Sequence, residues 1–225
     1  MMMRCILCNM PLVLSHHGIC SQCIENLPKL NKVCHQCCLP HSLSTNECYR
    51  CREKRPYWDE MVAVTGYIDP LKKLIQHLKF HNKIELTNAL ARLMFLAWYQ
   101  RRLSDGLAKP DIVTCVPLHH FRYWSRGFNQ AALLAKPIAR WLNREFKPHL
   151  LSRKFAARDQ KNLSLKQRMS NVETLFRCHS DLTNQSVMLI DDIVTTGNTI
   201  NVISQQLKES GAAYVQVVCL CRTVL

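Results

Sequence analysis

Four cysteine pairs of the form Cys-x-x-Cys occupy the first 51 residues of this chain and strongly limit how that segment can fold. The pairs are separated by ten or eleven residues, and nine of the thirteen cysteines lie in this segment. A Cys-x-x-Cys turn presents two thiolates on one side, where each can reach a tetrahedral zinc ion at about 2.3 Å. Because so short a segment buries little apolar surface, bound metal is expected to supply much of its folding free energy. We predict two structural zinc ions, held by Cys5, Cys8, Cys20, Cys23, Cys34, Cys37, Cys48 and Cys51.

The cysteine pattern leaves two alternatives open. Disulfides would use the same residues, but regular Cys-x-x-Cys pairs in a chain expected in a reducing compartment favour zinc. The pairs can share zinc sequentially, first with second and third with fourth, or alternate in a cross-braced arrangement. We favour sequential pairing, because each unit then closes locally over a short loop. All-cysteine sites are closed, so we predict no chemistry there. Cys38 directly follows Cys37 and is expected either to replace it or to stay unliganded.

The composition indicates a sizeable hydrophobic core and a strongly basic surface. The 225 residues are 48% apolar and carry a formal net charge of +14, which favours phosphorylated small molecules, nucleic acid or other polyanions as ligands. The apolar stretch Leu90–Tyr99 contains Arg92 and is far shorter than the ~20 residues of a membrane span, so it predicts a core helix. The sequence before and after Cys5 does not read as a secretory signal. We expect a cytoplasmic protein with no membrane span.

An apolar run followed by acids and hydroxyls predicts a ligand loop near the end of the chain. Val187–Ile190 fits a buried parallel strand, and Asp191 and Asp192 follow it directly. The residues Thr195–Thr199 open a helix whose first amides lack intrahelical partners, so amides and hydroxyls together can cradle a phosphate. Two adjacent carboxylates can bind a ribose diol, directly or beside Mg²⁺. A receiver-like acidic pocket or a plain buried strand is the alternative, which the Thr-Gly-x-Thr spacing disfavours.

A second loop carries groups that can bind another phosphate. Ile112–Val116 predicts a buried strand that ends at a proline turn, and the loop Leu118–Gln130 follows it. In a parallel α/β sheet such loops line the ligand crevice, where arginines supply bidentate donors and glycine permits close approach of the backbone. The candidate residues in this loop are Arg122, Arg126, Gly127, Asn129 and Gln130.

The remaining pattern predicts an α/β domain behind the cysteine segment. We place the boundary near Pro56, with a double zinc-ribbon module in residues 1–55 and the larger domain in residues 56–225. A strand is expected within Met61–Ile68, and a helix begins after Pro70. Further elements are expected over the ranges 84–103 (helix), 200–210 (helix) and 214–221 (strand).

These motifs resemble a known family. The thirteen residues Val187–Thr199 are similar to the 5-phosphoribosyl 1-pyrophosphate (PRPP) signature of type I phosphoribosyltransferases. The Val-Pro-Leu turn with Arg-Gly-Phe-Asn-Gln, the cysteine segment, Leu78–Phe80 and the run Arg158–Val172 resemble the competence protein F (ComF/GntX) branch of that fold. The resemblance implies a type I phosphoribosyltransferase-like fold, a parallel sheet flanked by helices, with a small zinc module at the N-terminal end.

The resemblance also implies roles for individual residues. Asp191 and Asp192 would face the ribose hydroxyls, and the 5′-phosphate would lie against Thr195, Thr196, Gly197, Asn198 and Thr199. Residues 118–130 would include the pyrophosphate loop, and the basic stretch between Arg153 and Arg168 would be a mobile flap, although it reads equally as a solvated basic loop. Candidates for stabilising the leaving pyrophosphate are Arg122, Arg126, Lys154 and Lys161.

The sequence is therefore consistent with two functions. The resemblance implies a protein of DNA uptake, competence and use of extracellular DNA as a nutrient, which binds PRPP with Mg²⁺, binds single-stranded DNA, and works with competence or DNA-processing proteins. Tyr123, Trp124 and Phe128, placed among Arg122 and Arg126, can stack on bases or pack against the sheet. The alternative is an active phosphoribosyltransferase of nucleotide salvage, with turnover and acceptor left open. Thr195 occupies the position of an aspartate in six-oxopurine enzymes, which disfavours a hypoxanthine-type activity.

Overall fold

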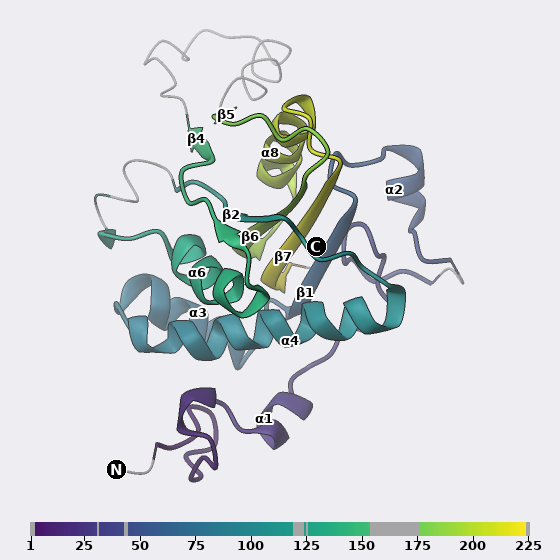
Figure 1. Ribbon diagram of the computed structural model, residues 1–225. Coiled ribbons are helices and arrows are strands. Elements are labelled where there is room, and N and C mark those ends of the chain that lie inside the picture. Colours follow the sequence, from purple (N-terminus) through teal and green to yellow (C-terminus); the bar gives the residue numbers. More distant parts are fainter. Residues whose placement is uncertain are drawn as a thin grey trace, which may run out of the picture.

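A parallel five-stranded sheet forms the centre of the computed structural model (Figure 1), which describes residues 3–30, 32–42, 45–118, 124, 126–153 and 176–223. The strand order is β1-β7-β6-β2-β3, and every neighbouring pair is parallel. The strands are β1 (Glu60–Gly66), β7 (Tyr214–Arg222), β6 (Ser186–Val194), β2 (Ile112–Cys115) and β3 (Glu145–Phe146). A separate antiparallel pair joins β4 (Leu151–Arg153) to β5 (Phe176–Cys178).

In the part of the chain that the structure describes, four longer helices connect the strands. They are α3 (Leu71–Phe80), α4 (Thr87–Asp105), α6 (Gln130–Leu142) and α8 (Asn198–Glu209). The helix predicted from residue 84 starts instead with a 3-10 turn, η2 (Ile84–Leu86), and α4 ends at Gly106, whose φ of 73° closes the helix in the left-handed region. The cysteine segment adds only η1 (Ser15–His17), α1 (Ser21–Glu25) and α2 (Tyr49–Glu53) among the described residues.

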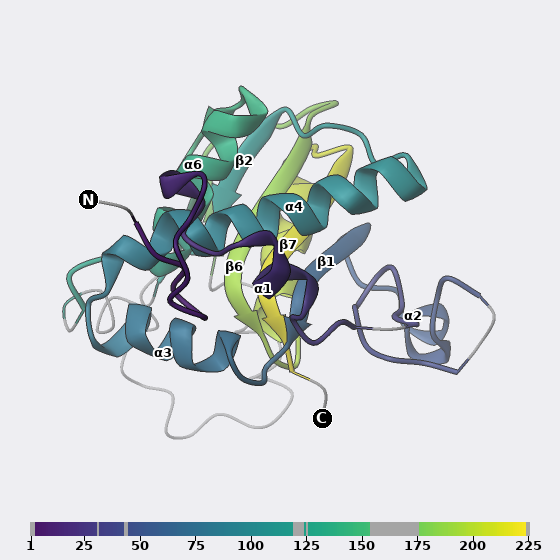
Figure 2. The same ribbon diagram turned by 90° about the horizontal axis from the view of Figure 1, so that it is seen from below.

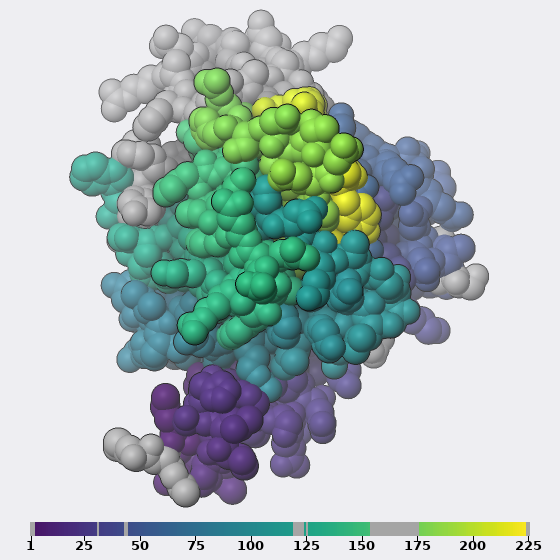
Figure 3. Space-filling model, viewed as in Figure 1, coloured from purple at the N-terminus to yellow at the C-terminus, as the bar shows by residue number. Residues whose placement is uncertain are grey.

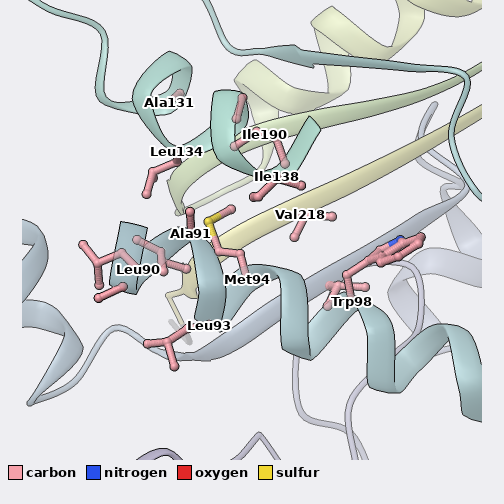
Figure 4. Close-up of a cluster of buried hydrophobic side chains, with 14 of the residues drawn as sticks. Leu90, Ala91, Leu93, Met94, Trp98, Ala131, Leu134, Ile138, Ile190 and Val218 are labelled. Atoms are coloured by element: carbon pink, nitrogen blue, oxygen red, sulfur yellow. The ribbon is translucent and has the colours of Figure 1, made fainter. Parts of the chain in front are cut away.

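The two faces of the sheet are covered by different helices, as the predicted α/β fold requires. Met188 and Ile190 of β6 belong to a hydrophobic cluster with α3, α4 and α6, and Figure 4 shows part of it around Met94, Leu134 and Ile138. Val187 and Leu189 belong to a second cluster, with α8. Alternate residues of one buried strand thus supply both cores. None of the described helices is long and apolar enough to cross a membrane.

The two halves of the cysteine segment pack in different places (Figures 1 and 2). Cys5, Ile19 and Leu27 are buried in the cluster with α4, and a Cβ at Gly18 would lie 2.6 Å from the Cβ of Ala89. The later cysteines instead share the cluster of α8. In the space-filling view of Figure 3, the first half forms a separate lobe beyond α4. The boundary near residue 55 stays a prediction.

The chain order opens a crevice between β2 and β6. The connection through α6 leads from β2 outward to β3, whereas the connection through α8 leads from β6 in the opposite direction, to β7. Right-handed crossovers in opposite directions place α6 and α8 on opposite faces, so the loops that leave β2 and β6 diverge. At this end β2 stops at Cys115, opposite Ile190, while β6 continues to Val194 beside β7. The last residues of β6 therefore lack a β2 neighbour.

Candidate functional site

A cavity of about 380 Å³ lies at the carboxyl ends of β2 and β6. It is lined by the turn after β2, the start of α6, the end of β6 and the start of α8, which the sequence predicted to meet. The described lining residues include Asp191, Asp192, Thr195, Thr196, Gly197, Asn198, Thr199, Asn129, Gln130, Lys79 and Arg153. The structure thus brings all seven residues of the predicted PRPP loop to one cavity.

The two acids differ in their surroundings. Asp192 is buried, and its Oδ2 lies 2.6 Å from the Nζ of Lys79 at the end of α3. The amide of Asp192 donates to Oδ1 of Asp191, and the amide of Ile193 donates to Oδ1 of Asp192, each at 2.8 Å. These bonds fix the orientation of both carboxylates, which line the cavity.

Asp191 is poised to gain from a ligand. Burial of its carboxyl and the adjacent charge of Asp192 raise its pKa well above the usual value near 3.8, although Lys79 opposes the shift. A like-charge pair that is partly removed from water is stabilised by a divalent cation or by hydroxyl donors. The pair can therefore receive Mg²⁺ or a ribose diol.

The start of α8 forms a surface that suits an anion, whereas the two acids suit a cation. Thr195, Thr196, Asn198 and Thr199 are exposed, and Gly197 is the N-cap of the helix, with a φ of 84°. The amide of Asn198 lies 3.4 Å from Oγ1 of Thr196. Amides and hydroxyls at a helix N-terminus favour an anion, so acids and an anion cradle share one cavity.

The loop before α6 supplies the facing wall. Asn129 caps α6 by accepting from the amide of Ala131 at 3.0 Å, and its Nδ2 donates to the carbonyl of Val116, also at 3.0 Å. Arg126 and Gly127 were predicted for the pyrophosphate loop, but they are not among the described residues that line the cavity. Arg126 donates to Oε1 of Gln130 at 3.2 Å and lies over the ring of Phe80.

Several predicted residues fall in undescribed segments. Arg122, Lys154 and Lys161 lie outside the described residues, as do Tyr123 and the run 158–172. Of the other aromatics in the loop, Trp124 is 78% exposed, whereas Phe128 packs against the core of α6. For Phe128 the packing alternative is the correct one.

The eight predicted zinc ligands form two groups of four. Cys5, Cys8, Cys20 and Cys23 make one group; Cys34, Cys37, Cys48 and Cys51 make the other; and within each group the sulfurs lie within 4.8 Å of one another. The sulfurs of Cys8 and Cys20 are 3.7 Å apart and those of Cys37 and Cys48 are 3.8 Å apart, close to the separation of about 3.8 Å that tetrahedral bonds of 2.3 Å imply. This grouping confirms the sequential pairing. All thirteen cysteines are free, so both donor sets fit structural zinc.

Neighbouring contacts suit thiolates in these groups. The amide of Cys20 donates to the sulfur of Cys5 at 3.4 Å, and the amide of Cys48 donates to that of Cys34 at 3.3 Å. Burial alone would raise the pKa of Cys5, but backbone amides, that of Cys20 foremost, lower it to about 6. Cys38 belongs to neither group, because its sulfur donates to the carbonyl of Met61 at 2.9 Å.

A third group of potential ligands is an ion-pair network. His35, Glu60 and Asp105 approach one another closely enough to hold a metal. Arg101, however, pairs with both carboxylates, at 2.9 Å from Glu60 and at closer range with Asp105. The guanidinium already supplies the positive charge that a cation would bring.

Four residues at the cavity or behind its loop were not predicted as site residues. Lys79 and Arg153 line the cavity, whereas Trp58 and Arg222 contact the loop Val194–Gly197. Arg153 entered only as the start of the predicted flap, and it lines the cavity. Lys79 lies four residues after the buried Ile75 on the apolar side of α3, a position that indicates a buried cation. Trp58 and Arg222 carried no local signal, because their partners are distant in sequence.

Comparison with known proteins agrees with this geometry. A family model described as "Phosphoribosyl transferase domain" matches residues 129–223. The DNA utilization protein YhgH of Escherichia coli K12 is 42% identical over 220 residues, which cover 98% of this chain and 97% of that protein. Competence protein F of Haemophilus influenzae is 36% identical over 97% of this chain and 96% of that protein. With this identity over nearly its whole length, the sheet order and the two tetra-cysteine groups, the chain belongs to the competence protein F (ComF/GntX) family, whose larger domain has the type I phosphoribosyltransferase fold.

Proposed function

We propose that this protein binds PRPP with Mg²⁺ in the cavity between β2 and β6 and handles single-stranded DNA in the cytoplasm as part of DNA utilisation. The main support for this ligand is that one cavity is lined both by a carboxylate pair, Asp191 and Asp192, and by the exposed hydroxyls and amides of Thr195–Thr199. A phosphoribosyl group carries both the diol and the phosphate that such a cavity complements.

Each part of the site has a role in this proposal. Asp191 and Asp192 hold the ribose hydroxyls and the Mg²⁺, which when bound neutralises the pyrophosphate. Thr195–Thr199 hold the 5′-phosphate, and the loop with Asn129 and Gln130 holds the pyrophosphate side together with Arg122. Residues 1–55 act as the zinc module and residues 56–225 as the ligand-binding domain.

The physiological setting is proposed from the relatives. The names of two of them refer to DNA utilization and to competence, and both align with nearly the whole of this chain. Competence or DNA-processing proteins are accordingly the proposed protein partners.

Calorimetry tests the ligand proposal. PRPP is expected to bind in the presence of Mg²⁺, and Asp191→Ala with Asp192→Ala is expected to weaken binding about hundredfold or more, because each change removes charge-assisted bonds worth about 1.5–3 kcal/mol. Glu85→Ala with Glu145→Ala is the control, since it removes two carboxylates that pair with Lys83 and Lys147 away from the cavity. Absence of PRPP affinity in the wild type, or equal affinity in the double variant, would contradict the proposal.

A test for turnover distinguishes a PRPP-binding protein from an active phosphoribosyltransferase. An active transferase would form a bond from the anomeric carbon of PRPP to an acceptor and release pyrophosphate, with Arg126, Lys154 or Lys161 stabilising the leaving group. Incubation with bases and oligonucleotides, followed by a pyrophosphate assay, decides between the two: release with one acceptor supports the alternative function of nucleotide salvage.

A specific surface supports the nucleic-acid part of the proposal. Phe95 and Tyr99 of α4 stack at 5.9 Å between ring centroids, and Trp141 of α6 meets Phe95 at 5.7 Å. Tyr99 is 44% exposed and Trp141 is 42% exposed. Helix α6 carries the exposed Lys136 and Arg140, and its sequence has no acidic residue. Exposed aromatics beside cations can stack on bases while the cations contact phosphates.

Substitutions on this surface test that role. Trp141→Ala or Tyr99→Ala is expected to weaken binding of a single-stranded oligothymidine by about 1–3 kcal/mol without changing its salt dependence, because stacking is lost and no charge is removed. Arg140→Gln is expected to weaken binding and to reduce the salt slope by about 0.7. Fluorescence anisotropy measures both quantities, with the exposed Tyr49→Ala as the control. Lack of binding at low salt would remove the nucleic-acid proposal; unchanged binding in all three variants would remove its assignment to this surface.

A further inference from the structure

One buried guanidinium joins the second cysteine group to the predicted phosphate loop. Arg222, the last residue of β7, is 3% exposed. Its Nε donates to the carbonyl of Cys37 at 2.8 Å, and its Nη1 donates to the carbonyls of Val194, at 3.1 Å, and Thr195. A single side chain therefore ties a zinc-ligand turn to the residues that lead into the cradle at α8.

A second contact starts from the same turn. The indole N–H of Trp58 donates to the carbonyl of Gln36, and Trp58 is 6% exposed. A Cβ added at Gly197 would lie 3.2 Å from the Trp58 ring, so the ring packs closely against the N-cap residue of α8. Gln36 and Cys37 both belong to the turn Cys34-x-x-Cys37, and the two contacts thus link one Cys-x-x-Cys turn to two points of the loop Val194–Gly197.

The position of these carbonyls depends on the metal site. A Cys-x-x-Cys turn is held in shape when both of its thiolates bind one ion, because the ion joins the two ends of a short turn. Without the ion, no metal joins the four sulfurs to one another, and that constraint is lost. The carbonyls of Gln36 and Cys37 would then no longer hold Trp58 and Arg222 in place.

The first cysteine group makes different contacts. Its segment packs against α4, where Gly18 approaches Ala89 and the carbonyl of Ile19 accepts from Arg92 at 3.4 Å. These residues belong to the cluster on the other face of the sheet from α8. The two metal groups are therefore expected to differ in their effect on the loop, although each consists of two Cys-x-x-Cys pairs with nearly the same spacing.

We propose that the metal at Cys34, Cys37, Cys48 and Cys51 positions the phosphate loop through Arg222 and Trp58, so that loss of this metal loosens residues 194–199 and weakens phosphoribosyl binding, whereas loss of the metal at the first group does not. Arg222 and Trp58 act as positioning residues, because they reach the loop backbone and not the ligand. The effect on affinity rests on the proposed function; the effect on the loop does not.

Hydrogen exchange on the full chain tests the link. Cys48→Ser is the informative variant, because it breaks the second group while leaving the sequence of the Cys34–Cys37 turn intact; Cys8→Ser is the matched control in the first group. Each variant is expected to hold one zinc ion. In Cys48→Ser the amides of Asn201 and Thr223, which donate to the carbonyls of Gly197 and Val194 of this loop, are expected to exchange at least tenfold faster than in the wild type, and in Cys8→Ser at the wild-type rate. Affinity for PRPP with Mg²⁺ is expected to fall about tenfold in Cys48→Ser alone.

Two further variants keep both metal ions. Arg222→Lys retains the charge but loses the planar fork that reaches several carbonyls, and Trp58→Phe retains an aromatic ring but loses the indole donor. Both are expected to speed exchange of the Asn201 and Thr223 amides with two zinc ions still bound. They test the link independently if Cys48→Ser does not fold. Unchanged loop exchange in these variants, or equal effects of Cys48→Ser and Cys8→Ser, would overturn the proposal. A wild type without PRPP affinity would defeat the proposed function, while the exchange data would still decide the link.

Discussion

Removal of both zinc ions by a chelator under reducing conditions is expected to destabilise the whole protein and not only its cysteine segment. Cys5 is buried with the α4 core, and Cys34 is buried with the α8 core, so each metal group is part of a main hydrophobic cluster. Structural zinc contributes about 10–16 kcal/mol in zinc-finger peptides, comparable with the net stability of about 5–15 kcal/mol of a whole domain. A loss of even 5 kcal/mol corresponds to a fall of roughly 10–20 °C in the thermal midpoint.

Metal analysis and thermal unfolding check this expectation together. The purified chain should contain two zinc ions, and restoring zinc after chelation should restore the midpoint. Cys38→Ser is the control, because Cys38 belongs to neither group and a serine hydroxyl can replace its donation to the carbonyl of Met61. A metal-free chain with an unchanged midpoint, or one zinc ion in place of two, would contradict the prediction.

What the sequence could predict was local. The pairing of the cysteines followed from short loops, and each unit closes within its own stretch of chain. The cradle at α8 followed from a contiguous run in which an apolar strand, two acids and Thr195–Thr199 occur in order. Such features depend on neighbours within a few residues, which the sequence displays directly.

What it could not predict depends on long-range packing. Lys79 meets Asp192 across more than a hundred residues, and Arg222 meets Cys37 across 185. These pairs form only because α3 and the second cysteine group lie against the ends of β6 and β7. The sequence also suggested one zinc module, whereas its two halves join different cores, because nothing in the Cys-x-x-Cys spacing states which face of the sheet each half covers.

Among single substitutions in the cavity, the one that breaks the buried pair of Lys79 and Asp192 is expected to lower the free energy of unfolding most. Lys79→Met removes a cation that is 15% exposed and leaves the carboxylate of Asp192, 5% exposed, without its charge partner. Breaking a buried pair in this way costs about 3–5 kcal/mol. Lys73→Met is the matched control on the same helix, because Lys73 and Asp69 are 71% and 52% exposed and such pairs contribute about 0–1 kcal/mol.

The loss of stability in Lys79→Met should also depend on pH. Lys79 is one of the influences that lower the pKa of Asp191, so its removal raises that pKa further above the usual value near 3.8. A carboxyl with a raised pKa in the folded state takes up a proton on folding, and stability then increases as pH falls through the window between the two values. The difference between wild type and variant should therefore be smaller at pH 5 than at pH 8 in urea titrations. Adding Asp192→Asn to Lys79→Met should recover much of the loss, because the charge without a partner is gone. An equal loss at both pH values, or a loss no larger than that of Lys73→Met, would show that the pair is not a buried ion pair in solution.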